Sequence, residues 1–312
     1  MRDSLWIVVL AGGDGTRLGA LTRALYGDER PKQFAVLAGD RSLLQQTVER
    51  AAALVPLDRV IVIVTAHHEA RAREQLARYP GVELVIQPRN LDTAPGLMLP
   101  LARIRARDRN ARVAFLPSDH HVVNAGPILA AIADSAHGST RAQITLLGVD
   151  PDHPEIEYGW ITRGRAIRRR DGAAAFAVDG FVEKPAADTA RELHARGALW
   201  NTFISVGPVE GFWRLARSFL PDHSRRLEDY ATRVGAEDEH AALTATYAAL
   251  PPANFSSEVF SRARKLVVIP VTGSGWCDWG SPDRVFRSLA GTPHHEALVA
   301  RIAGSAPVAL AS

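Results

Sequence analysis

The sequence predicts an α/β fold in which one mixed sheet is flanked by helices. In the first 150 residues, short β-branched runs alternate with stretches of helical periodicity, which is typical of a parallel sheet covered on both faces. After Asp150 the alternation stops, and a hairpin-like pair of strands precedes a series of helical segments. We therefore expect one domain that carries a substrate-facing insertion in its second half, and not two independent domains.

Five apolar segments in the first half are predicted to form buried parallel strands. They cover residues 6–10, 60–64, 83–86, 113–116 and 144–148.

Helical patterns lie between these strands. One begins after Ser42, a residue type that caps helix N-termini, and places Leu43, Leu44, Val48 and Ala52 on one face. The other helices of this half are expected at roughly residues 69–78, 95–107 and 127–137.

In the second half, residues 160–167 and 176–182 are predicted to pair as a hairpin. The segment between them, Arg168 to Gly172, contains an Asp-Gly pair that favours a tight turn. The remaining elements are expected as helices at 187–195, 209–219, 223–234 and 239–249, a strand at 266–270, and a helix after Pro282. We expect residues 1–290 to form the domain and residues 291–312 to form a C-terminal tail.

Composition limits the classes of function. The 312 residues carry 37 Lys+Arg against 34 Asp+Glu, and this small net charge of +3 does not indicate a nucleic-acid partner. The single cysteine, Cys277, excludes a disulfide framework and a cysteine-rich zinc module. No run of 18 apolar residues and no signal-peptide layout is present, so we expect a cytoplasmic protein without a membrane partner.

The first predicted strand runs into a glycine-rich loop. Gly12, Gly13 and Gly15 would let the backbone approach an anion closely, although the spacing matches neither a P-loop nor a dinucleotide fingerprint. Spacing alone therefore leaves a phosphate-binding loop and a plain tight turn as equal alternatives. Arg17 favours phosphate, because its planar guanidinium can bind two oxygens at once, and Lys32 could bring an ammonium to the same anion.

Further motifs follow this loop in a fixed order. They are Pro31–Phe34 (PKQF), Ser42–Thr47 (SLLQQT), Thr93–Pro95 (TAP), Leu116–His120 (LPSDH), Tyr158–Ile161 (YGWI), Phe181–Pro185 (FVEKP), Trp200–Thr202 (WNT) and Trp276–Ser281 (WCDWGS). Over roughly residues 5–285 the set resembles the sugar-phosphate nucleotidyltransferases. The PKQF segment, followed by SLLQQT, is similar to the mannose-1-phosphate guanylyltransferase branch of that family.

The resemblance implies a Rossmann-like, GT-A-like fold of the nucleotide-diphospho-sugar transferases. It divides the domain into a nucleotide-binding half at about residues 1–150 and a sugar-phosphate-binding half at about 151–290. The implied reaction joins GTP and mannose 1-phosphate into GDP-mannose and pyrophosphate, by in-line attack of a sugar phosphate oxygen on the α-phosphorus. The implied cofactor is Mg²⁺ or another divalent cation, held by Asp119 and Asp278.

The resemblance also assigns the remaining site residues. The catalytic set that it implies is Arg17, Lys32, Asp119, Lys184 and Asp278. The nucleotide-binding set is Leu10, Ala11, Gly12, Gly13, Gly15, Thr16, Arg17, Gln87, Asn90, Thr93, Ala94 and Asp119. The sugar-phosphate-binding set is Gly159, Glu183, Lys184 and Asn201.

Two departures from the family pattern leave the substrates open. Gln87 stands where guanylyltransferases typically have an acidic residue, and residues 254–258 replace a segment usual in the mannose branch. The alternatives are a nucleotidyltransferase for another hexose 1-phosphate or another NTP, and a non-catalytic nucleotide-sugar sensor. The oligomeric state stays open, a homo-oligomer included. The short C-terminal part implies a stand-alone transferase.

Adjacent histidines occur at 67–68, 120–121 and 294–295. Neighbouring side chains on a strand or loop usually point apart, and no cysteine or third ligand at a suitable spacing accompanies them. We therefore expect no zinc site.

Overall fold

The computed structural model describes residues 4–138, 143–168 and 174–305, and one mixed sheet organises them. The strand order is β3-β2-β1-β4-β8-β5-β9-β7-β6. The strands are β1 (Leu5–Leu10), β2 (Val60–Thr65), β3 (Glu83–Gln87), β4 (Arg112–Pro117), β5 (Thr145–Val149), β6 (Gly159–Ala166), β7 (Phe176–Glu183), β8 (Leu199–Pro208) and β9 (Val267–Pro270).

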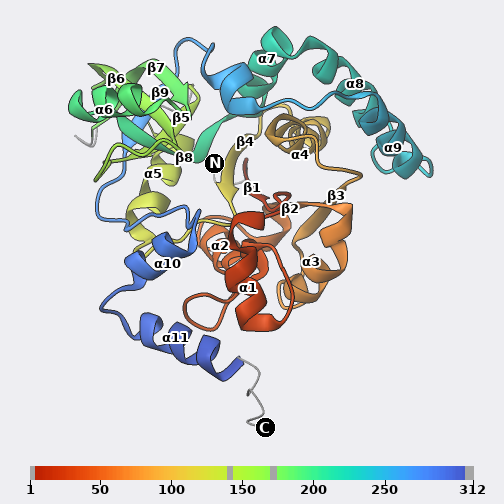
Figure 1. Ribbon diagram of the computed structural model, residues 1–312. Helices are drawn as coiled ribbons and strands as arrows, with labels where there is room; N and C mark the ends of the chain where they lie inside the picture. Colours follow the sequence, from red (N-terminus) through yellow and green to blue (C-terminus); the bar gives the residue numbers. More distant parts are fainter. Residues whose placement is uncertain (1–3, 139–142, 169–173, 306–312) are drawn as a thin grey trace.

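Helices flank this sheet and extend beyond it (Figure 1). They are α1 (Gly19–Tyr26), α2 (Leu43–Ala52), α3 (Glu69–Leu76), α4 (Thr93–Arg107), α5 (Gly126–His137), α6 (Ala187–Ala195), α7 (Val209–Phe219), α8 (Pro221–Ala231), α9 (Glu239–Ala249), α10 (Pro282–Leu289) and α11 (Pro293–Ser305). The predicted fold class is confirmed.

The first half of the sheet is parallel, as predicted. β1 pairs in parallel with β2 on one side and β4 on the other, and β2 pairs in parallel with β3. Successive residues of β1 point to opposite faces: Trp6 and Val8 enter one hydrophobic cluster, whereas Ile7 and Val9 enter another. Both faces of this strand are therefore buried, which explains its unbroken apolar sequence.

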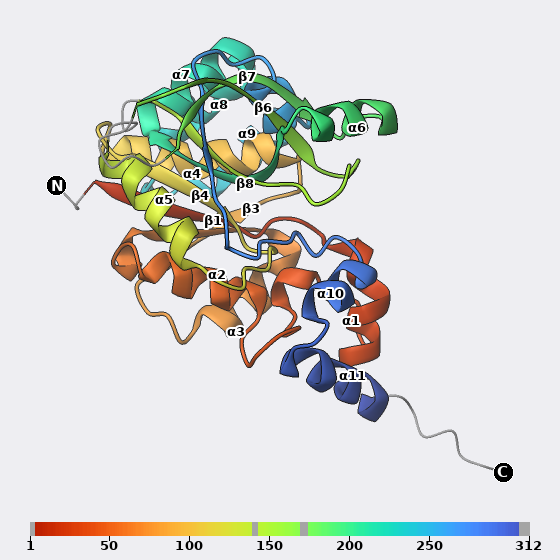
Figure 2. The same ribbon diagram turned by 90° about the vertical axis from the view of Figure 1, so that its left-hand side faces the viewer.

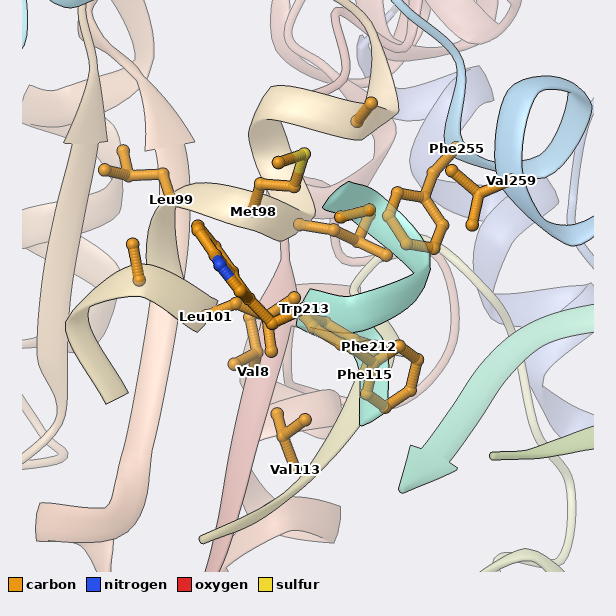
Figure 3. Packing of buried hydrophobic residues seen from close by; sticks show 14 of the residues in the cluster. Val8, Met98, Leu99, Leu101, Val113, Phe115, Phe212, Trp213, Phe255 and Val259 are labelled. Carbon is orange, nitrogen blue, oxygen red and sulfur yellow. The ribbon is translucent and has the colours of Figure 1, made fainter. Parts of the chain in front are cut away.

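Helices cover the two faces of the sheet (Figure 2). Residues of α4, α7 and α8 pack on one face, where Figure 3 shows Met98, Phe212 and Trp213 beside Val8 and Phe115. Residues of α2, α3 and α5 pack on the other face. A third cluster joins α1 to α10 and α11 and includes Leu18, Trp279 and Leu298.

Strand β8 is the main element that the sequence does not predict. It lies between β4 and β5 and is antiparallel to both. Its middle is irregular: Phe203 has a φ of 60°, and the register with β5 shifts between Leu146 and Gly148. The Thr202 hydroxyl donates to the Leu147 carbonyl at 2.7 Å, so a side chain replaces part of the ladder there.

Three other segments extend or modify the predictions. β5 pairs in parallel with the late strand β9 and antiparallel with β8. The hairpin of β6 and β7 forms with Gly159 opposite Glu183, but its expected turn includes residues 169–173, outside the described residues. Residues 291–312 are predicted to form a C-terminal tail. Within them, α11 forms, and its Leu298 packs in the hydrophobic cluster that includes residues of α1. Among the described residues, no helix is long and apolar enough to cross a membrane.

Candidate active site

A cleft of about 870 Å³ lies at the carboxyl end of the parallel strands. This is where open α/β sheets bind ligands, because the loops that follow parallel strands gather at one edge. Most of the residues selected from the sequence line it: Leu10, Ala11, Gly12, Gly13, Arg17, Gln87, Asn90, Thr93, Asp119, Gly159, Glu183, Lys184, Asn201 and Asp278. Gly15, Thr16, Lys32 and Ala94 do not form its wall.

The glycine-rich loop is held in place by the side chain of Gln33. The Gln33 side-chain amide donates to the carbonyls of Ala11 at 3.1 Å and Gly13 at 2.7 Å. Gly15 has a φ of 59°, and a Cβ there would lie 2.8 Å from the backbone nitrogen of Lys32. Only glycine fits this position, because the left-handed backbone and the close approach both exclude a side chain. Gly15 and Gln33 thus shape the loop, and of the two Gln33 also lines the cleft.

Lys32 is buried, with 5% of its surface exposed, and it contacts both aspartates selected from the sequence. Its Nζ lies 3.1 Å from Asp119 Oδ2 and donates to the backbone carbonyl of Asp278. The ammonium therefore joins the loop after β4 to the turn before α10. In this arrangement it neutralises carboxylate charge.

Asp119 follows β4 and keeps 35% of its side chain exposed. Burial raises the pKa of this carboxyl, but the charges of Lys32 and His120 outweigh burial, and its pKa is lowered overall. The charge of Asp278 also acts to raise the pKa of Asp119, and both aspartates line the same cleft.

Asp278 is buried among donors. Its Oδ1 accepts from the Tyr158 hydroxyl at 2.7 Å, the Gly280 amide at 2.8 Å and Arg284 Nη1 at 3.0 Å, while Arg17 Nη2 lies 3.8 Å from its Oδ2. Burial raises the pKa of Asp278, yet Lys32 and Tyr158 keep that pKa below its ordinary value. Sequence reasoning missed both Tyr158 and Arg284 as partners of Asp278.

The donor set fits a divalent cation such as Mg²⁺. Two carboxylates line one cleft, and the pKa of each is lowered, so both are ionised at neutral pH. Mg²⁺ prefers a few carboxylate oxygens together with water and substrate oxygens. Asp119 and Asp278 are thus the residues of this cleft that would hold it.

The other wall of the cleft comes from β6, β7 and β8. A Cβ on Gly159 would lie 2.7 Å from Glu183 Oε2, so glycine makes room for that carboxyl. Burial raises the pKa of Glu183. Asn201 is 8% exposed, and its side-chain oxygen accepts from the Phe203 amide at 3.1 Å.

Backbone strain gathers around the cleft. Among the described residues, five that are not glycine have positive φ, namely Asp92, Lys184, Phe203, Lys265 and Trp279. Asp92, Lys184 and Phe203 line the cleft, and Trp279 follows Asp278. Such conformations cost about 1–3 kcal/mol each and often occur at functional sites.

Gln87 lies at the end of β3 with 4% of its surface exposed. Its Oε1 accepts from the Tyr247 hydroxyl at 3.1 Å, and its Nε2 faces Gly12, where a Cβ would approach to 2.7 Å. Tyr247 lies on α9, and its hydroxyl is also 3.3 Å from the Pro95 carbonyl. The orientation of the Gln87 amide therefore depends on a residue that no local motif connects to it.

In a comparison with known families, residues 7–292 match the Nucleotidyl transferase family. The chain belongs to that family. The family resemblance inferred from the sequence is thereby confirmed.

Relatives within the nucleotidyl transferase family include two bacterial proteins. The chain is 31% identical over 309 residues to a protein named mannose-1-phosphate guanylyltransferase ManC from Salmonella typhimurium, covering 94% of this chain and 62% of that protein. It is 30% identical over 291 residues to a mannose-1-phosphate guanylyltransferase from Escherichia coli, covering 90% of this chain and 59% of that protein. The chain thus spans about 60% of the length of these curated relatives.

A solved structure is also similar. A protein described as mannose-1-phosphate geranyltransferase from Thermus thermophilus superposes with a TM-score of 0.79 at 32% identity, covering 93% of this chain and 81% of that chain. This match covers the parallel half of the sheet and the later strands together.

Proposed function

We propose that this chain transfers a guanylyl group from GTP to mannose 1-phosphate, forming GDP-mannose and pyrophosphate. The observation that carries the proposal is one cleft that brings together the glycine-rich loop, the carboxylates Asp119 and Asp278, and the Glu183–Lys184 segment. The similar proteins named mannose-1-phosphate guanylyltransferase support this choice of substrates.

In the proposed reaction, an oxygen of the sugar phosphate attacks the α-phosphorus of the nucleotide. The bond from the α-phosphorus to the bridging oxygen breaks, and pyrophosphate leaves with that oxygen. Because both reactants are anions, repulsion opposes their approach. Positioning and charge neutralisation are therefore what the protein supplies, and no covalent enzyme intermediate is needed.

Each wall of the cleft has a role in this proposal. Gly12, Gly13 and Arg17 bind the phosphates of the nucleotide, and Gln87 contacts the base. Lys184 binds the phosphate of the sugar, while Glu183 and Asn201 contact its hydroxyls. In this division, residues 1–150 supply the nucleotide side and residues 151–290 the sugar-phosphate side.

A bound divalent cation would neutralise charge on the phosphates from its place on Asp119 and Asp278. Lys32 keeps Asp119 ionised and ready to hold it, since the ammonium lies 3.1 Å from the carboxylate. Tyr158 and Arg284 hold Asp278 in one orientation through bonds of 2.7 and 3.0 Å. The protein side chains thus prepare the oxygen ligands before substrate arrives.

The amide of Gln87 supports an alternative nucleotide substrate. Gln87 presents an amide where a carboxylate would accept two donors from guanine, and an amide offers one acceptor and one donor. A transferase for another NTP or another hexose 1-phosphate is therefore the alternative within the same chemistry. A sensor that binds nucleotide sugars without turnover is the alternative outside it.

A substrate matrix tests the proposal. Four NTPs are combined with mannose, glucose and related hexose 1-phosphates in the presence of Mg²⁺, and pyrophosphate release is measured. We expect the highest kcat/KM for GTP with mannose 1-phosphate and loss of activity on chelation. Faster turnover of another pair would identify that NTP and that hexose 1-phosphate as the substrates. Binding of nucleotide sugars without turnover of any pair would favour the sensor.

A further inference from the structure

Asp14, His67 and His68 converge beside the glycine-rich loop. His67 Nε2 lies 2.9 Å and His68 Nε2 lies 3.5 Å from the same oxygen, Asp14 Oδ1. Ligand atoms of all three residues lie within 4.8 Å of one another, and among the described residues no other such group of three His, Cys, Asp or Glu was found. None of the three belongs to the proposed Mg²⁺ site.

The local backbone explains how two neighbouring histidines meet. Residues Ala66–His68 form a 3₁₀ turn, in which successive side chains are about 120° apart and not on opposite sides as in a strand. The two imidazole rings accordingly lie 3.8 Å apart between centroids, with their planes inclined by 56°. The expectation that these side chains point apart is wrong for this pair.

His68 gives a second, independent observation that points to a ligand. The residue is buried, with 8% of its surface exposed, yet its Nε2 has no hydrogen-bond partner. A buried polar atom without a partner costs about 1–3 kcal/mol. This nitrogen faces Asp14 Oδ1, where a bound ion would satisfy both atoms.

The surroundings hold the other two groups in place. Asn90 Nδ2 donates to the second oxygen of Asp14 at 3.1 Å, which leaves Oδ1 for the histidines. The Phe34 ring packs against the edge of His68 with centroids 5.5 Å apart. His67 and Asp14 keep 56% and 47% of their side chains exposed, so an ion could enter from solvent.

We propose that Asp14, His67 and His68 bind one transition-metal dication of the Zn²⁺ class. Ligands about 2.0–2.1 Å from a tetrahedral ion lie about 3.3 Å from one another, and the two observed separations of 2.9 and 3.5 Å bracket that value. Imidazole nitrogen with one carboxylate suits Zn²⁺ or Co²⁺, whereas Mg²⁺ prefers oxygen ligands. The ion would tie the glycine-rich loop to the start of α3.

Cobalt binding to untagged, chelator-treated protein tests this proposal without nucleotide or sugar, so the result is independent of the transferase activity. We expect one Co²⁺ per chain, with visible absorption that Zn²⁺ abolishes and excess Mg²⁺ does not. His67→Ala and Asp14→Asn, both at exposed positions, should each weaken binding by about tenfold or more. Circular dichroism verifies that both variants fold.

The matched control is His294→Ala, which changes an exposed histidine of another adjacent pair, on α11. It should bind Co²⁺ as the wild type does. The proposal fails if the wild-type protein binds no Co²⁺, if His67→Ala or Asp14→Asn binds it unchanged, or if His294→Ala weakens binding as much as those two variants. Each of these results would mean that the three side chains do not form a site.

Discussion

Asp119 and Asp278 are held to different degrees. Asp278 is 7% exposed and accepts bonds from Tyr158, Gly280 and Arg284, whereas Asp119 is half-buried and pairs with Lys32. Removing the charge of Asp278 takes one anion from Arg284, which still pairs with Glu155, whereas removing the charge of Asp119 takes the carboxylate from the buried Lys32. Either substitution is therefore expected to cost stability as well as activity.

Asp119→Asn and Asp278→Asn should each lower kcat by about 100-fold or more, on the order of 3 kcal/mol, because an amide supplies no charge to a divalent cation. Steady-state kinetics with saturating Mg²⁺ measure this loss. Asp283→Asn, at an exposed position on α10, is the control and should leave kcat unchanged. Near-wild-type rates in both variants would refute the shared cation site.

Lys184→Ala should raise the KM for the sugar phosphate more than the KM for the NTP, since the ammonium is assigned to the sugar side. The matched control is Lys265→Ala. Lys265 is also exposed and also has a positive φ, 66° against 45° for Lys184, but it does not line the cleft. A larger change in the KM for the NTP would show that Lys184 serves the other substrate.

Gln87→Glu should increase the preference for GTP over ATP several-fold, about 1 kcal/mol or more, because a carboxylate accepts both donors of a guanine edge. The ratio of kcat/KM values measures this preference and cancels any general loss from burying a charge. Tyr247→Phe removes the hydroxyl that holds the amide and should change the same ratio while preserving turnover. A ratio unaltered in both variants would remove Gln87 from base recognition.

At the scale of single elements, the residue that caps α2 also bonds to another helix. Ser42 and Gln45 form a reciprocal capping box, with both bonds at 3.2 Å. The Ser42 hydroxyl also donates to the side chain of Gln75 on α3 at 2.6 Å. The cap was predictable from the residue type, but the bond to Gln75 was not.

Ser42→Ala should destabilise the protein by about 1–2 kcal/mol, because the helix loses its cap and the partly buried side-chain oxygen of Gln75 loses its donor. Denaturant unfolding measures the change, and kcat/KM should stay near the wild-type value. Ser218→Ala on α7 is the control, since its exposed hydroxyl bonds only to the carbonyl of Arg214 within the same helix. Equal losses in both variants would contradict the capping role.

Strand β8 links the two halves of the cleft. Its amino end carries Asn201 into the cleft, and residues 205–208 pair with β4, whose carboxyl end leads to Asp119. The residues Trp200-Asn201-Thr202 mix polar and aromatic side chains and give no period-two pattern. The strand forms because β4 and β5 both offer it an edge.

At the scale of the whole molecule, an ion network joins the sheet edge to three helices. Glu83 on β3 binds Arg103 at 3.0 Å and also pairs with Arg107, both on α4. Arg103 in turn donates to Tyr230 on α8 at 2.7 Å and pairs with Glu239 on α9. The network thereby holds α8 and α9 against α4 and the edge strand β3.

Glu83→Gln should lower the free energy of unfolding at pH 7 by about 1–3 kcal/mol, because Arg107 loses its pairing with Glu83 and Arg103 keeps only Glu239 as an anionic partner in this network. Burial raises the pKa of Glu83, but Arg107 and Arg103 lower it below the ordinary 4.5. The unfolded chain therefore binds this proton first as pH falls, and the stability present above pH 4.5 is lost as pH falls through the lowered pKa.

Unfolding curves at pH 7 and at a pH below that transition check this prediction. The gap between wild type and Glu83→Gln should shrink at the lower pH. Glu192→Gln, at an exposed position on α6, is the control and should show only a small gap at both values. A gap for Glu83→Gln that does not depend on pH would contradict the assignment of the network to charge.

The sequence by itself determined the strand and helix alternation of residues 1–150, the glycine-rich loop and the family. These features are encoded locally: a strand buried on both faces must be apolar throughout, and Gly15 needs a backbone that only glycine adopts readily. The same reasoning placed Asp119 after β4 and Lys184 after β7. Local patterns and the family resemblance together thus selected half of the residues that line the cleft.

Only the tertiary structure decided how those residues are partnered. Local sequence patterns did not indicate these partners. Tyr158 and Arg284 bind Asp278, Tyr247 binds Gln87, Lys32 pairs with Asp119, and the two histidines contact Asp14. β8 also depends on edges supplied by distant strands. The physical reason is that hydrogen bonds and charge interactions depend on distances of a few ångströms in space, whatever the separation along the chain. The hydrophobic periodicity of a helix or strand does not show which distant side chain will lie beside it.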